Sequence, residues 1–194
     1  MMAGAQLEVL TVADHSSDHS CQPCSGIIGN TIGFPVDQSR REGFLQSLFG
    51  QVRTFAFVSE LAEVTDLFAD HPVEQALGLI FGGDVLDVDA NSDYGAAFGR
   101  FHEDFGSAVN RRSTVIILGD GRGNGNDPNV EAFAEITRRA RETIWLTPEP
   151  RYSWGLGGCD LPVYAEYCSR VRVVRDLTGL ESAAEEMATE LVGR

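Results

Sequence analysis

The sequence predicts an α/β fold with a doubly wound, mostly parallel sheet and helices on both faces. Segments with strand and helix patterns alternate along the chain, as expected for parallel strands joined by crossover helices. Residues 115–118 form a continuous apolar run, which is typical of a strand buried on both faces. The aromatic residues of 94–105 recur at helical spacing, which indicates a helix packed on a core. With 194 residues the chain can form one such domain.

The elements are predicted from apolar periodicity and from turn and cap residues. Strands are expected at 7–12, 52–58, 114–118, 143–148 and 170–176, with a tight turn and a short returning edge strand within 59–68. Helices are expected at 40–51, at 71–81 with Pro72 in the first turn, at 94–105, and at about 177–191. A further helix is expected to open with Asp127 as cap and Pro128 as first residue, with Phe133, Ile136 and Ala140 facing inward.

Composition restricts the function. The net charge is −14, and all 15 basic residues are arginine, so the chain has no lysine for a phosphate loop or a Schiff base. An acidic surface repels phosphate backbones and anionic lipids, which argues against nucleic-acid and membrane-surface binding and favours a cationic partner or a divalent metal. Residues 1–17 lack the basic region of a signal peptide, and no segment has the length of a membrane span, so we expect a cytoplasmic protein.

The N-terminal segment is expected to differ from the rest. We divide the chain into residues 1–38, the first strand followed by an irregular segment, and an α/β domain over 39–194. The irregular segment contains His15, His19, Cys21 and Cys24, whose side chains suit zinc. Their spacing is poor for a folded zinc site, which favours a flexible polar segment, and the four cysteines of the chain are expected to be reduced.

Acidic and hydroxyl side chains follow several of the predicted strands. Asp120 comes directly after the buried strand at 114–118, where α/β sheets bind ligands. The alternating glycines around it do not have the spacing of a dinucleotide fingerprint. Asp14 and Ser16 follow the first strand, and Ser92 lies in the loop before the aromatic helix. Oxygen ligands of this kind suit Mg²⁺, although Ser92 also fits a helix cap and Asp120 a turn.

Four ordered motifs support a family resemblance over roughly residues 44–192: RTFAFVSELAEVTDLF, NSDYGAAFGRF, TVIILGDGRGN and IWLTPEPRYSWGLGG. Together they resemble the von Willebrand factor A (VWA) domain of the CoxE-like family. The resemblance implies a Rossmann-like, doubly wound sheet with a metal-ion-dependent adhesion site (MIDAS). That site takes an Asp-x-Ser-x-Ser motif after the first strand, a Thr or Ser from a second loop and an Asp from a third.

The resemblance assigns Asp14, Ser16, Ser92 and Asp120 as ligands of Mg²⁺ or Mn²⁺, with Asp18 in the place of the motif's second serine. It implies no catalytic residue and no organic cofactor. A partner protein would complete the metal shell with an acidic side chain. CoxE-like proteins are similar to accessory, chaperone-like factors that act with MoxR-type AAA+ ATPases in metalloenzyme maturation, and this is the function that the resemblance implies.

Two alternatives remain open at this stage. A metal-dependent hydrolase would use Asp120 with the carboxylates of the acidic loop at 84–93. A decayed VWA domain would fold without binding metal. Loss of turnover in an Asp120→Ala variant would identify the first, and a lack of any response to metal would identify the second.

Overall fold

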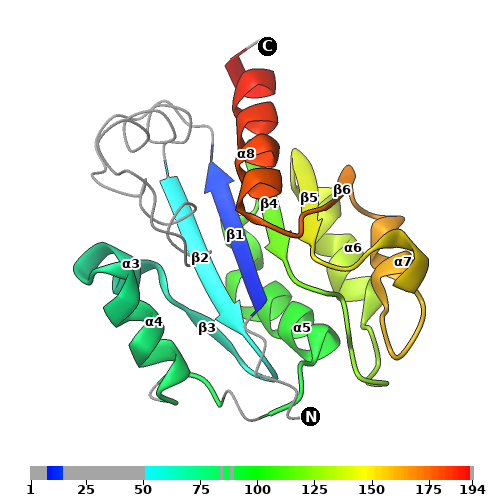
Figure 1. Ribbon diagram of the computed structural model, residues 1–194, viewed down its shortest axis with the longest axis horizontal. Helices are drawn as coiled ribbons and strands as arrows, with labels where there is room; N and C mark the ends of the chain where they lie inside the picture. The colour runs from blue at the N-terminus through cyan, green and yellow to red at the C-terminus, as the bar shows by residue number, and fades with distance from the viewer. Residues whose placement is uncertain (1–7, 15–50, 84, 88–89, 193–194) are drawn as a thin grey trace.

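The computed structural model describes residues 8–14, 51–83, 85–87 and 90–192. Its centre is a six-stranded sheet in the order β3-β2-β1-β4-β5-β6 (Figure 1). The strands are β1 (Glu8–Asp14), β2 (Gln51–Phe57), β3 (Leu61–Glu63), β4 (Ser113–Leu118), β5 (Glu142–Thr147) and β6 (Arg170–Val173). The helices are α3 (Thr65–Asp70), α4 (Val73–Phe81), α5 (Tyr94–Phe105), α6 (Val130–Arg139), α7 (Leu161–Ala165) and α8 (Leu177–Val192). The α/β class is therefore confirmed.

The sheet is mixed, which corrects the expectation of a mostly parallel one. β4, β5 and β6 are parallel neighbours, but β1 is antiparallel to both β2 and β4, and β2 is antiparallel to β3. The arrow of β1 points opposite to that of β2 beside it (Figure 1). A strand's apolar pattern is the same in either direction, so periodicity predicted β1 correctly but not its orientation.

The larger core lies between one face of the sheet and helices α5 and α6. Alternate residues of the strands point to this face, because successive side chains of a strand lie on opposite sides. Phe98 and Phe101 of α5 and Phe133 of α6 pack here, all with no exposed surface, as the helical spacing predicted. Trp145 of β5 stacks on Tyr94, with ring centroids 5.5 Å apart. These rings fix the start of α5 against the middle of the sheet.

The opposite face has two smaller cores. Ala76 and Ile80 of α4 pack with Ala56 of β2, and Leu180 and Ala183 of α8 pack with residues of β4 and β5. Helices therefore cover both faces of the described sheet. Figure 1 shows α4 on the side of the sheet where β2 and β3 lie, and α8 starting near β4 and extending beyond the strands toward the C-terminus.

Two helix starts differ from the prediction. Residues 65–70 form α3 directly after the edge strand, because the Thr65 hydroxyl accepts a hydrogen bond from the backbone N–H of Thr54 (3.0 Å) where another strand residue would have paired. Helix α6 begins at Val130, with the residue before it, Asn129, in the left-handed region (φ 45°). Asp127 accepts from the N–H of Asn129 (3.0 Å), so it forms a turn before the helix and does not cap it.

Several expectations fall on residues outside the described ranges. These are the helix at 40–51 up to residue 50, the irregular segment at 15–38, and the zinc candidates His15, His19, Cys21 and Cys24. Of the cysteines that the structure describes, Cys159 and Cys168 are free thiols, as expected. Within the described ranges, no helix has the length and apolar character that a membrane crossing requires.

Candidate functional site

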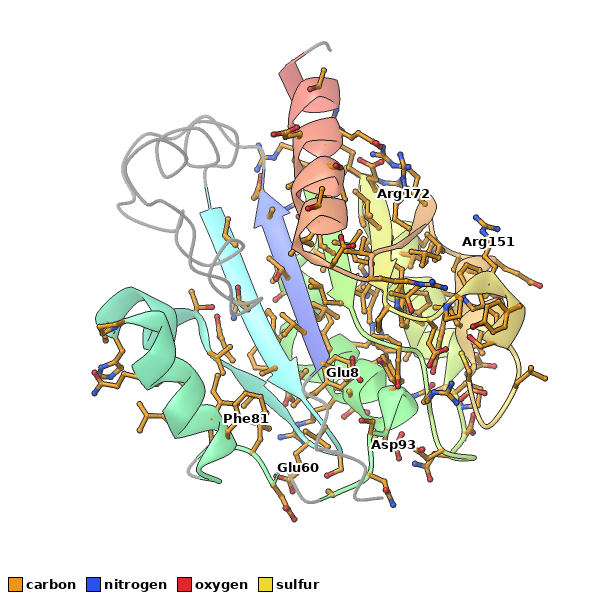
Figure 2. The ribbon with its side chains drawn as sticks, viewed as in Figure 1. Glu8, Glu60, Phe81, Asp93, Arg151 and Arg172 are labelled. Atoms are coloured by element: carbon orange, nitrogen blue, oxygen red, sulfur yellow. The ribbon has the colours of Figure 1, made fainter. Side chains whose placement is uncertain are left out.

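The candidate site lies at the edge of the sheet where β2, β4 and β5 end and where β1 begins. Glu8, the first residue of β1, pairs with Phe57 at the end of β2, and Val9 pairs with Leu118 at the end of β4. The loop that precedes α5 reaches the same edge, because the N–H of Asp93 donates to the carbonyl of Val58 after β2 (2.8 Å). Figure 2 shows Glu8 and Asp93 at this end of the molecule.

Asp120 stands directly beyond β4 and is only 8% exposed. Its Oδ1 accepts a hydrogen bond from the backbone N–H of Arg122 (2.8 Å), and its Oδ2 lies 3.6 Å from the Nε of Arg122. Burial raises the pKa of Asp120, while the Arg122 backbone N–H and the Arg122 charge oppose that rise. Asp120 is therefore a largely enclosed carboxyl group with one cationic neighbour.

Arg122 ties the loop after β4 to the loop after β5. Its Nε and Nη2 donate to Oε1 of Glu149 at 2.9 and 2.6 Å, and its Nη1 donates to the carbonyl of Gly157 at 3.0 Å. The Ser153 hydroxyl donates to the other oxygen of Glu149 (2.5 Å). Hydrogen bonding by Ser153 and then by Arg122 lowers the pKa of Glu149, so this carboxylate stays ionised and keeps Arg122 in place.

Ser92 reaches the same edge through its backbone. Its carbonyl accepts from the side-chain amide of Asn124 (3.0 Å), which also donates to the carbonyl of Arg122 (3.2 Å). Asn124 holds this position with a left-handed backbone (φ 55°), a conformation that asparagine adopts more readily than most residues. The cap of α5 is Asp93, which accepts from the N–H of Ala96 (2.9 Å), so the structure does not assign Ser92 that role.

The structure separates Asp14 from this edge. Asp14 is the last residue of β1 and pairs with Ser113, the first residue of β4, so the full length of β4 lies between Asp14 and Asp120. The Asp14 carboxylate accepts from the side-chain amide of Asn110 (3.2 Å) and lies 3.7 Å from Arg112. The reason is the reversed direction of β1. Ser16 and Asp18 lie outside the described residues.

Sequence analysis missed Glu8, which the structure places at the site. Glu8 has no exposed surface, and neither of its carboxylate oxygens has a hydrogen-bond partner in good geometry among the described residues. Burial and the nearby charge of Asp120 raise its pKa well above the usual value, and the Tyr94 hydroxyl beside it opposes this shift. The available signal was an acidic residue sharing a strand face with the core residues Leu10 and Val12.

The glycine at 119 makes room for this acidic group. A Cβ at residue 119 would lie 2.0 Å from Oε2 of Glu8 and 2.1 Å from the Tyr94 hydroxyl oxygen. That hydroxyl accepts from the N–H of Gly121 (3.0 Å), so its own proton is available to a carboxyl group. The indole N–H of Trp145, in β5, donates to the carbonyl of Gly119 (2.9 Å) and so holds the turn before Asp120 against β5.

The described residues of the acidic loop give little support to the hydrolase alternative. Asp87 is exposed and Asp93 caps α5, while residues 84 and 89 lie outside the described ranges. Across the residues that the structure describes, no three or more His, Cys, Asp or Glu side chains form a group suited to a metal ion. Any metal at this edge would therefore need hydroxyl, backbone or water ligands beside the Asp120 and Glu8 carboxylates.

Comparison with known proteins gave one family. No curated protein and no solved structure matched the chain. A family model described as "VWA domain containing CoxE-like protein" matches residues 42–183, which include β2 to β6 and the first part of α8 but not β1. Because the match spans more than half of the chain, the protein belongs to the family of VWA domain containing CoxE-like proteins.

Proposed function

We propose that this protein is a non-enzymatic interaction module that uses the edge around Asp120 to bind a partner protein in a metal-dependent way. Membership in the VWA CoxE-like family suggests a protein-interaction module, and the family is generally a non-catalytic accessory one. The observation that carries the proposal is the enclosed carboxyl group of Asp120 just beyond β4. The side chain of Asn124 bonds to the backbone of both Ser92 and Arg122, so it holds the loop of Ser92 against the loop that contains Asp120.

A magnesium or manganese ion fits the chemistry of this edge. The Asp120 carboxylate and the Ser92 hydroxyl are hard oxygen ligands of the kind that Mg²⁺ prefers, and a low number of protein ligands leaves positions for water. The buried, unpartnered carboxylate of Glu8 supports the fit, because a buried negative charge is stable only beside a cation or a proton. When bound, the ion would supply an open coordination position for an acidic side chain of the partner.

The protein's own residues hold the loops in place for this contact. Arg122 and Glu149 fix the loop after β4 against the loop after β5, and Asn124 fixes it against the loop of Ser92. The charge of −14 would repel an acidic partner group in the absence of a cation. Binding is therefore expected to need the metal, with Asp120 as the essential ligand.

We further propose that the partner is a MoxR-type AAA+ ATPase and that the pair acts as a chaperone-like factor in metalloenzyme maturation. Support for this step is family membership. The test is co-elution of the purified chain with a MoxR-type ATPase from the same organism, in Mg²⁺ throughout. Wild type and Asp104→Asn, a surface control in the exposed Arg100–Asp104 ion pair, should co-elute, and Asp120→Asn should not.

Two results would contradict this proposal. Equal co-elution of Asp120→Asn and wild type would show that the contact does not use the Asp120 edge. Absence of co-elution for wild type would remove the ATPase partnership. Keeping Mg²⁺ constant matters, because chelation would also disable nucleotide binding by the ATPase.

A further inference from the structure

We infer that Glu8 is the first-strand member of the metal site, so that β1 contributes its ligand from the start of the strand and not from its end. This inference rests on the proposed function, since it concerns the same metal site. It names a residue outside the matched region 42–183 and outside the motif that follows the strand.

The first argument is the position of Glu8. Because β1 is antiparallel to β4, its first residues lie beside the end of β4, and the register pairs Val9 with Leu118, two residues before Asp120. The carboxyl group at the start of β1 therefore lies near the Asp120 carboxyl group in the loop beyond β4, with the Tyr94 hydroxyl beside both. Because β1 is reversed, its first residue, Glu8, lies at the edge of the sheet near Asp120, and Asp14 lies at the opposite edge.

The second argument is the state of the Glu8 side chain. It is completely buried, and neither oxygen makes a hydrogen bond of good geometry with the described residues, although the Tyr94 hydroxyl lies beside it. Buried polar groups in proteins are nearly always paired, so an unpaired buried carboxylate indicates a ligand or a proton that completes it. Arg122 lies beside Asp120 and is held by Glu149.

The third argument is the space around Glu8. A side chain at residue 119 would collide with Oε2 of Glu8 and with the Tyr94 hydroxyl, so the glycine lets both polar groups approach the turn before Asp120. The neighbouring Gly121 has a φ of 74° and donates its N–H to Tyr94. Tyr94 can then donate its proton to a carboxylate and orient it, as groups around metal ligands commonly do.

The experiment is a Mn²⁺ titration followed by the electron paramagnetic resonance signal of free Mn²⁺, on wild type and three isosteric variants. Glu8→Gln and Asp120→Asn should each weaken Mn²⁺ binding by at least about tenfold. Asp14→Asn, at the other end of the same strand, is the matched control and should bind as wild type does. Unfolding curves in EDTA verify that each variant is folded.

Each of the other possible outcomes would contradict one specific part of the inference or of the proposed function. If Glu8→Gln binds Mn²⁺ as wild type does while Asp120→Asn does not, the role of Glu8 is wrong and the metal site of the proposed function stands. If Asp14→Asn weakens binding as much as Glu8→Gln, the assignment of the strand's start is wrong. If wild type binds no Mn²⁺, the metal dependence in the proposed function fails, and the role of Glu8 fails with it.

Discussion

Arg122 donates two hydrogen bonds to the same oxygen of Glu149, from Nε at 2.9 Å and from Nη2 at 2.6 Å. The pair joins the loop after β4 to the loop after β5, and its two side chains are 31% and 17% exposed. Since Asp120 lies between β4 and Arg122 in the chain, this ion pair supports the loop that contains Asp120.

This support predicts coupling between the two residues. Arg122→Gln and Glu149→Gln should each destabilise the fold, and a double-mutant cycle should give an interaction of about 1 kcal/mol, because charged hydrogen bonds that are partly shielded from water are worth more than exposed ones. Chemical denaturation of the two single variants and the double variant measures this value. Strictly additive effects would contradict the support role.

Glu8 predicts an unusual dependence of stability on pH in EDTA. Burial and the charge of Asp120 raise its folded-state pKa above the usual 4.5, so the folded state binds the proton more tightly than the unfolded state does. The stability that this proton provides is complete below pH 4.5 and is lost as the pH rises through the folded-state pKa.

Glu8→Gln lacks this loss, so its melting temperature should exceed that of wild type by an amount that grows from pH 5 to pH 8. Thermal unfolding at a series of pH values measures the difference. The charged or titratable neighbours are Asp120, whose raised pKa acts in the same direction, and Tyr94, which the substitution leaves in place. A difference that stays constant with pH would show that Glu8 does not titrate in this range.

Metal should stabilise the folded protein. At 100 times its dissociation constant, a ligand of the folded state adds about 2.7 kcal/mol to the free energy of unfolding. Thermal unfolding of wild type in EDTA and then in millimolar Mg²⁺ or Mn²⁺ should show this increase, and Asp120→Ala should not. Equal curves with and without metal for wild type would favour the decayed domain. The two tryptophans give a second readout, since Trp145 is bonded to the turn before Asp120.

Gly119 should tolerate no side chain. Gly119→Ala would place its Cβ 2.0 Å from Glu8 and 2.1 Å from Tyr94, and we expect a loss of about 1–3 kcal/mol in the free energy of unfolding. Gly78→Ala is the matched control, because its Cβ would meet nothing within 4 Å in helix α4, and it should stabilise by up to about 1 kcal/mol. Urea denaturation compares the two. A neutral Gly119→Ala variant would mean that the turn can move away from Glu8.

The sequence by itself determined most of the described elements and the aromatic core, but not helix α3 or the start of α6. The apolar run of 115–118 gave β4, and the helical spacing of Tyr94, Phe98 and Phe101 gave a helix buried on the sheet. These predictions held because burial acts on each element's own periodicity, which is local information. The position of Asp120 at a strand's end was predictable for the same reason.

Tertiary structure alone decided the direction of β1 and, with it, the members of the site. The apolar pattern of residues 8–14 is equally suited to either orientation, and the connection to β2 is long enough to allow both. In the folded chain β1 pairs antiparallel with both β2 and β4, which places Asp14 at one edge of the sheet and Glu8 at the other. The site depends on contacts between residues distant in sequence, and local periodicity contains no information about them.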